Sequence, residues 1–244
     1  MEVCLIGDGL ISLTLAKALI NNKIKVFMYC KNNKKTSNNN RTIGITSNNL
    51  DFFQKKIIEI KKDLFWEIEQ IEIYNEQNKK EKIFNFEEPG KILFSIVRNN
   101  DLYTLLSRNL EKNNNFKKIE IKNKSFYKKI IQNNKYDLII NCDGSNEISK
   151  KYFYRNVIKN YKSKAYVTII NHKKIKNKKA IQIFTKYGPI AFLPISENQT
   201  SIVYSIKDKS INNKLELSQN ELEKLIFKNN KLYEINSINK FQTF

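Results

Sequence analysis

The chain opens with Glu2-Val-Cys-Leu-Ile-Gly-Asp-Gly-Leu-Ile-Ser12, which leads into Leu13-Thr-Leu-Ala-Lys-Ala-Leu-Ile20. The first residues form a short apolar run that favours a buried strand, and the residues after Gly9 place apolar side chains at helical spacing. Gly7 and Gly9 stand between the two runs, where the backbone must bend sharply. The stretch therefore predicts a strand, a glycine turn and a helix.

This order of elements is suited to binding the pyrophosphate of a dinucleotide. Gly7 permits the tight turn, Gly9 lets the backbone approach the phosphates, and the helix offers unpaired N–H groups and the positive end of its dipole. Ser12 replaces the usual third glycine and is small enough for close packing of helix on strand. A purely structural turn is the alternative. The residues expected to bind a cofactor here are Gly7, Asp8, Gly9, Leu10, Ile11 and Ser12.

A second strand, Ile24–Cys30, completes a strand–helix–strand unit of the length that such sites use. Its end departs from the usual pattern. An Asp or Glu commonly holds a ribose hydroxyl at this point, whereas this chain has Cys30 followed by Lys31. We therefore expect a weaker contact with the adenosine half of the cofactor.

The composition predicts a soluble, cytoplasmic protein. The 244 residues include 41% hydrophobic side chains, enough for one or two packed cores, and no apolar stretch of membrane-spanning length. The three cysteines, Cys4, Cys30 and Cys142, are odd in number and widely spaced. This spacing fits a reducing compartment and predicts neither a disulfide framework nor a metal site.

The formal net charge of +20 raises the alternative of a basic protein that binds polyanions. Lys and Asn are spread through every segment, however, and arginine is scarce. A nucleic-acid surface would concentrate Arg and interleave aromatic residues. We expect no nucleic-acid partner, while the charge leaves open a peripheral contact with a membrane or a biosynthetic complex.

Two further segments carry candidate cofactor ligands. Arg41 follows a polar loop and precedes a helix predicted from about Asn48 to Lys62, so it could reach a phosphate or ribose or remain a solvated loop residue. Asp143 and Gly144 follow the apolar run Tyr136–Cys142, read as a buried parallel strand. Ligands bind beyond the carboxyl ends of such strands. Asp143 could accept a hydrogen bond from a ribose or polyol, or cap a helix.

The second half of the chain changes character. Runs rich in β-formers predict an antiparallel sheet, with Thr185–Pro189 as a hairpin turn between two of its strands. His172, the only histidine, and Trp66, the only tryptophan, are expected to be structural residues. No acid–base pair stands out, so the sequence leaves the catalytic residues unknown. The predicted strand runs are Tyr161–Ile170, Lys179–Phe184, Pro189–Ile195 and Gln199–Ile206.

The ordered motifs resemble those of the UbiH/UbiF-type ubiquinone-biosynthesis hydroxylases, which are FAD-dependent aromatic monooxygenases. The motifs are Gly7-x-Gly-x-x-Ser12, Arg41-Thr-Ile-Gly-Ile, Arg98-Asn-Asn-Asp-Leu102, Cys142-Asp-Gly144 and Phe184-Thr-Lys-Tyr-Gly-Pro-Ile-Ala-Phe-Leu-Pro194. The resemblance implies an α/β fold in which a Rossmann-like FAD-binding domain with a doubly wound, mostly parallel sheet carries an antiparallel β-sheet substrate domain. It implies FAD-binding segments at 1–65 and 90–152, substrate-domain segments at 66–89 and 153–212, and a helix and return strand toward the FAD domain at 213–244.

The resemblance also implies an activity: hydroxylation of a prenylated phenol or quinol with FAD as cofactor and NAD(P)H and O₂ as co-substrates, at or near the inner membrane. Gly7 to Ser12 would bind the FAD pyrophosphate, Arg41 would lie near the flavin, and Asp143 and Gly144 would touch the FAD. Gly188 and Pro189 would border the substrate pocket near the flavin ring.

Four departures from the family pattern accompany the resemblance. Besides Cys30, Arg98 stands where the family usually has Glu, and Glu147 where Ser often follows the Asp-Gly motif. The sequence also stops at Phe244, before the second flavin motif. We therefore expect a truncated or split monooxygenase. A non-catalytic scaffold that binds FAD or NAD is the alternative.

Overall fold

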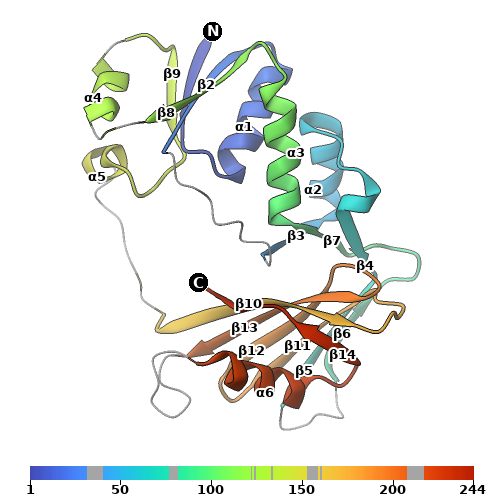
Figure 1. Cartoon of the computed structure of the whole chain (residues 1–244). Helices are drawn as coiled ribbons and strands as arrows, with labels where there is room; N and C mark the ends of the chain where they lie inside the picture. Colours follow the sequence, from blue (N-terminus) through green and yellow to red (C-terminus); the bar gives the residue numbers. More distant parts are fainter. Residues whose placement is uncertain are drawn as a thin grey trace. The chain divides into compact units, whose positions relative to one another are not determined.

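The computed structural model describes residues 1–31, 41–76, 82–121, 123, 125–132, 134–152, 159, 161–207 and 217–244. The chain forms two compact units (Figure 1). The first comprises residues 1–37, 51–60 and 100–158, and the second comprises residues 38–50, 61–99 and 159–244.

The first unit contains a four-stranded sheet in the order β8-β2-β1-β9, and all three pairings are parallel. This is the strand order with which a dinucleotide-binding sheet begins. Burial is deepest in the central strand, where Val3, Cys4 and Leu5 are fully buried. The strands are β1 (Glu2–Ile6), β2 (Lys25–Lys31), β8 (Phe116–Ile121) and β9 (Leu138–Asn141).

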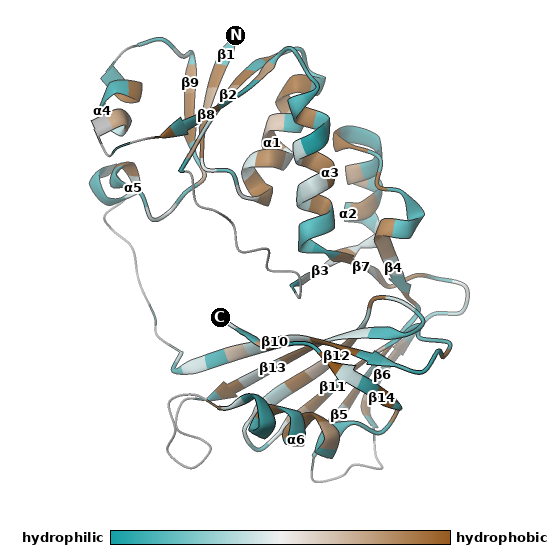
Figure 2. Ribbon diagram, viewed as in Figure 1, coloured by the Kyte–Doolittle hydropathy of each residue, from teal (hydrophilic) through white to brown (hydrophobic). Residues whose placement is uncertain are grey.

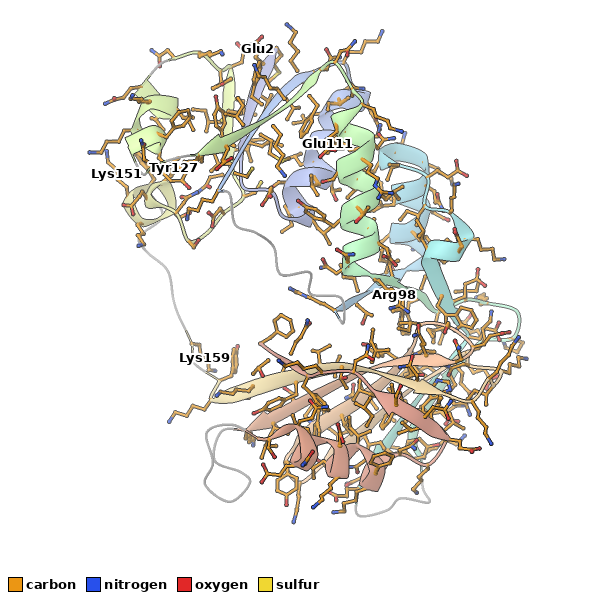
Figure 3. The ribbon with its side chains drawn as sticks, viewed as in Figure 1. Glu2, Arg98, Glu111, Tyr127, Lys151 and Lys159 are labelled. Atoms are coloured by element: carbon orange, nitrogen blue, oxygen red, sulfur yellow. The ribbon has the colours of Figure 1, made fainter. Side chains whose placement is uncertain are left out.

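Helices cover both faces of this sheet, as a doubly wound fold requires (Figure 1). Alternate residues of a strand point to opposite faces. Cys4 and Ile6 therefore share one face of β1, where they pack in a cluster with residues of α4 and α5. Tyr127 of α4 belongs to this cluster and points towards the sheet (Figure 3). The helices are α1 (Leu10–Asn21), α3 (Asn99–Glu111), α4 (Ser125–Gln132) and α5 (Glu147–Tyr152).

The second unit is built from two sheets and a helix. Its larger sheet has the order β14-β10-β13-β12-β11-β5-β6, with β15 also paired to β10, and its pairings are antiparallel except for β11 with β5. The strands of this sheet are β5 (Gln70–Asn75), β6 (Lys82–Glu87), β10 (Ser163–His172), β11 (Lys179–Thr185), β12 (Gly188–Pro194), β13 (Gln199–Lys207), β14 (Ile235–Ile238) and β15 (Gln242–Thr243). The smaller sheet pairs β3 (Thr42–Thr46), β7 (Phe94–Arg98) and β4 (Phe65–Ile68) in the order β3-β7-β4.

Helix α6 (Gln219–Asn229) covers one face of the larger sheet (Figure 1). A capping box between Ser218 and Glu221 fixes its start. Leu222 and Ile226 are buried on this helix and pack in a cluster with residues of β10 to β13. Apolar residues accordingly recur along the central strands of this sheet (Figure 2).

The fold class predicted from the sequence is confirmed, with local corrections. The helix predicted from Asn48 to Lys62 consists of α2 (Ser47–Phe52) and a π-helical turn, η1 (Phe53–Ile57), followed by a 3₁₀ turn, η2 (Lys62–Leu64). The helix ends early because the Gln54 side chain forms hydrogen bonds with the backbone of Ile60. Gln54 Oε1 accepts from the Ile60 N–H (2.8 Å), and Gln54 Nε2 donates to the Ile60 carbonyl (2.9 Å).

Two further differences concern strands. The predicted strand Tyr136–Cys142 is parallel, as expected, but β9 lies at the edge of its sheet, so Leu138 is exposed rather than buried. At the end of the chain, β14 and β15 pair with β10 inside the second unit. The domain bounds drawn from the sequence, with a return strand toward the FAD domain in 213–244, stay a prediction. Among the described residues, no helix combines the length and apolar character needed to cross a membrane.

Candidate functional site

Gly7 makes the turn that joins β1 to α1. Its φ of +106° is one that other residues rarely adopt, and its N–H donates to the carbonyl of Tyr29 (2.8 Å). A Cβ at this position would lie 3.4 Å from the Cβ and backbone N of Asp143. The glycine therefore brings the end of β1 against the end of β9. Gly7 and Asp143, both predicted site residues, lie side by side.

Gly9 is the N-cap residue of α1 and has an ordinary backbone conformation, with φ −71°. A Cβ built on it would meet nothing within 4 Å. No side chain caps the helix, and its first turn carries no acidic residue. The start of α1 is thus uncapped, with open space beside Gly9, and a helix N-terminus of this kind can bind phosphate.

Asp8 lies between the two glycines and is held by a cation. Lys118 of β8 forms an ion pair with its Oδ2 (3.4 Å), and the Tyr103 hydroxyl of α3 donates to the same oxygen (3.4 Å). Because Lys118 offsets the negative charge of Asp8, the carboxylate does not leave an uncompensated charge beside the anion site. Sequence reasoning missed Lys118 and Tyr103, since neither belongs to a motif.

Asp143 and Gly144 form the turn that follows β9. Asp143 Oδ1 accepts from both the backbone N–H (2.9 Å) and the hydroxyl (2.7 Å) of Ser145. Partial burial raises the pKa of the Asp143 carboxyl, but the two Ser145 bonds and nearby Lys31 outweigh it and hold the pKa below its usual value. The carboxylate is therefore ionised and can accept hydrogen bonds from hydroxyl groups.

The N-cap of the helix after Asp143, one of the roles considered for Asp143, is Asn146. Asn146 accepts the N–H of Ser149 (2.9 Å) at the start of α5, and its amide is bonded to Asn141 of β9 (2.6 Å). The Ser149 hydroxyl donates to the carbonyl of Asp143 (2.8 Å). This network fixes the turn at the end of β9 and holds Asp143 beside Gly7.

Ser12, predicted to bind the cofactor, is a small buried residue in the first turn of α1. Its side chain is almost fully buried, and its hydroxyl has no hydrogen-bond partner among the described residues. Burying an unpaired hydroxyl costs about 1–3 kcal/mol. The glycine turn, the uncapped helix and this small buried side chain together fit a dinucleotide pyrophosphate.

Arg41 belongs to the second unit, whereas the glycine turn and Asp143 belong to the first. Its carbonyl accepts the N–H of Asn99 (3.0 Å), and its guanidinium lies 5.5 Å from the centre of the Phe244 ring. Arg98, at the end of β7 (Figure 3), donates to the side chain of Gln199. A contact between Arg41 and the cofactor stays a prediction.

Gly188 and Pro189, the last two residues of the predicted hairpin turn, begin β12. The pairing of Thr185 with Gly188 confirms the hairpin. Gly188 has φ +142°, and a Cβ on it would lie 2.1 Å from the carbonyl oxygen of Ser205. The glycine is thus required by the close approach of β13. Its place beside a substrate stays a prediction.

His172 and Trp66 are structural residues in the second unit. The imidazole of His172 is 2% exposed, lies 3.0 Å from Thr200 Oγ1, and packs 4.4 Å from the Tyr233 ring. Trp66 packs against the buried Ile68 and Ala180 and donates to the carbonyl of Asn177. In the described parts of the chain, no group of His, Cys, Asp and Glu side chains could hold a metal ion.

Comparison with known proteins yields matches in structure alone. No protein-family model matches the chain, and no curated protein matches it significantly. PqsL of Pseudomonas aeruginosa, described as a probable FAD-dependent monooxygenase, has a TM-score of 0.70 and 12% identity over 93% of this chain and 66% of its own. PqsL has also been solved with 2-aminobenzoylacetate. The fold is shared.

Two further solved structures extend the comparison. p-Nitrophenol 4-monooxygenase PnpA of Pseudomonas putida has a TM-score of 0.70 and 10% identity over 100% of this chain and 68% of its own. A geranylgeranyl bacteriochlorophyll reductase-like protein of Thermoplasma acidophilum has a TM-score of 0.67 and 16% identity, over 99% of this chain and 65% of its own. The chain spans 62–66% of the length of the PqsL structures. At these identities the likeness establishes the fold.

Proposed function

We propose that this chain binds FAD and acts as a flavin-dependent monooxygenase on an aromatic ring. The observation that carries the proposal is the uncapped start of α1 behind Gly9, open to solvent and adjoining the Asp143 turn. The monooxygenases among the structural neighbours support this assignment.

Each part of the site has a separate task. The N–H groups from Gly9 to Ser12 would bind the pyrophosphate, and the ionised Asp143 would accept a hydroxyl of the ribityl chain or ribose. Lys118 would keep Asp8 neutralised beside the phosphates. Bound FAD supplies electron transfer from NAD(P)H and the activation of O₂.

The substrate would lie on the second unit, over the face of the larger sheet opposite α6. Strand alternation places Ala191 and Val203, which pair across β12 and β13, on that face, while Phe192 and Tyr204 point to α6. Small and apolar side chains give a floor that excludes water from an aromatic ring. Gly188 and Pro189 would form one border of this floor.

We further propose a prenylated phenol or quinol as substrate and ubiquinone biosynthesis as the setting, with NAD(P)H as reductant. The support is the ordered set of motifs from Gly7 to Pro194, together with a neighbour named for a phenolic substrate. A peripheral contact with the inner membrane belongs to the same proposal, since an excess of lysine attracts anionic lipid.

The test is turnover under ¹⁸O₂ with the full chain, FAD, NAD(P)H and a prenylated phenol. We expect substrate-dependent oxidation of NAD(P)H and a product that gains one ¹⁸O atom. Saturable FAD binding without such oxidation would contradict hydroxylation and favour a non-catalytic flavin scaffold. Failure to bind FAD, combined with steeply salt-dependent binding to DNA, would favour the polyanion-binding alternative.

A further inference from the structure

The second unit contains a pocket of about 310 Å³ on the α6 side of its larger sheet. Side chains of β5, β11 and β12 form its floor, and the end of α6 with the following loop forms its wall. Its volume is at the lower end of the range for small-molecule sites.

This pocket lies on the opposite face of the sheet from the proposed substrate floor. Glu72 and Tyr74 line it, so their neighbours Ile71 and Ile73 on β5 point to the other face. Ile71 indeed packs in the cluster with Trp66 and Ala180. A ligand in the pocket would therefore be separated from the proposed substrate by the thickness of the sheet.

Asn229, the last residue of α6, lines this pocket and carries a buried, unpaired acceptor. The residue is 4% exposed, and its Oδ1 has no hydrogen-bond partner among the described residues. Its Nδ2 donates to the carbonyl of Leu225 (2.8 Å), so the amide cannot be flipped without setting two carbonyl oxygens against each other. A hydrogen-bond donor on a ligand would satisfy a buried acceptor of this kind.

The polar side of the pocket carries an excess of positive charge. The nearly buried carboxylate of Glu72 is bonded through Oε1 to Lys82 (2.8 Å) and Lys179 (3.0 Å), and through Oε2 to the Tyr74 hydroxyl (2.7 Å). Among the described residues, one carboxylate thus faces two ammonium groups. An anionic group is favoured at this side.

The apolar part of the pocket is rigid and suits a flat ring. The Phe192 and Tyr233 rings stack with centroids 6.0 Å apart and planes 22° apart. Asn230 holds the loop after α6 by accepting the N–H of Tyr233 (3.0 Å) and donating to its carbonyl (2.7 Å). A preformed wall lowers the entropic cost of binding.

We propose that this pocket is a second ligand site, selective for a small aromatic carboxylate that carries a hydrogen-bond donor. The ring would lie on Ile181, Ile183 and Phe192, the donor would meet Asn229 Oδ1, and the carboxylate would lie near Lys179. The site is assembled within one unit, so it stands apart from the proposed flavin function.

The test is calorimetric titration of the full chain with 4-aminobenzoate, which combines the three features. We expect saturable binding with a Kd in about the micromolar to millimolar range, as a ligand of this size allows. Benzoate lacks the donor and ethyl 4-aminobenzoate lacks the charge, so each should bind about fivefold to tenfold more weakly, the loss expected for one hydrogen bond or ion contact.

Matched variants locate the site. Asn229→Leu and Lys179→Gln should each weaken binding about fivefold to tenfold. Ala191→Val, on the opposite face of β12, should leave the affinity unchanged. Equal affinities for 4-aminobenzoate and benzoate, absence of saturable binding in wild type, or loss of binding in Ala191→Val with retention in Asn229→Leu would each overturn the proposal. FAD binding, measured in parallel, reports separately on the proposed function.

Discussion

Gly7 and Gly9 serve the glycine turn in different ways. Gly7 is required by its positive φ and by the approach of Asp143, whereas Gly9 has an ordinary conformation and open space beyond it. We predict that Gly7→Ala lowers the free energy of unfolding by about 1–3 kcal/mol. Gly9→Ala should change it by less than about 0.5 kcal/mol. Urea denaturation measures both, and equal losses in the two variants would contradict this division of roles.

Gly188 gives a sharper prediction at the same scale. A methyl group there would overlap the Ser205 carbonyl oxygen at 2.1 Å, and backbone atoms cannot move aside as a flexible side chain does. We predict that Gly188→Ala lowers the free energy of unfolding by more than about 3 kcal/mol. Pro189→Ala serves as the neighbouring control, with a smaller loss. Thermal unfolding followed by circular dichroism measures both, and a stable Gly188→Ala protein would refute the clash.

Glycines were the residues from which most could be predicted, because their conformational role is local and visible in the sequence. The turn at Gly7 and the hairpin before Gly188 followed from them. The partners of Asp8, by contrast, come from distant strands and helices, and no local pattern marks them. The same holds for Asn229, whose unpaired acceptor depends on tertiary packing.

At the scale of elements, β5 carries a buried carboxylate whose charge stabilises the sheet. Burial raises the pKa of Glu72, but bonds from Lys82, Tyr74 and Lys179 outweigh it and lower the pKa below its usual value. The stabilisation is therefore present above the unfolded-state pKa, about 4.3, and is lost as the pH falls through the lower folded-state pKa. Burial, together with the contact to Glu72, raises the pKa of Tyr74 to about 12.

We predict that Glu72→Gln lowers the free energy of unfolding by about 2 kcal/mol at pH 7. The difference from wild type should shrink as the pH falls below the unfolded-state pKa of about 4.3 and towards the lower folded-state pKa of Glu72. Glu87→Gln on exposed β6 is the control and should have little effect. Urea denaturation across pH 3–7 measures the series. A difference that does not change with pH would contradict the charge-based account.

The strands and helices themselves were largely predictable. Apolar runs gave β1, β2 and β10 to β13 within a few residues, because burial on a sheet leaves a strong local pattern. The early end of α2 with η1 was not predictable, since the Gln54 side chain competes with the helical hydrogen bonds. The edge position of β9 was not predictable either, because it depends on which strands pair with β9 in the folded sheet.

At the scale of the whole molecule, strand alternation with helices followed by β-rich runs predicted a parallel and an antiparallel part, and the structure contains both. The strand partners of the chain's end were beyond sequence reasoning, because β14 and β15 are short and pair with the distant β10. The net charge of +20 did not help to predict the fold, because solvent-exposed lysines are compatible with any fold.

The central claim is that the turn from Gly7 to Ser12 binds FAD. The most direct test is a titration of the full chain with FAD, followed by visible absorption and flavin fluorescence. We predict saturable binding with shifted flavin bands in the wild-type protein. In Gly9→Ala, whose fold is unchanged, we predict binding weakened by about tenfold or more, because a methyl group would occupy the path of the pyrophosphate. Flavin spectra unaffected by the wild-type protein, or equal affinity in Gly9→Ala, would contradict the claim.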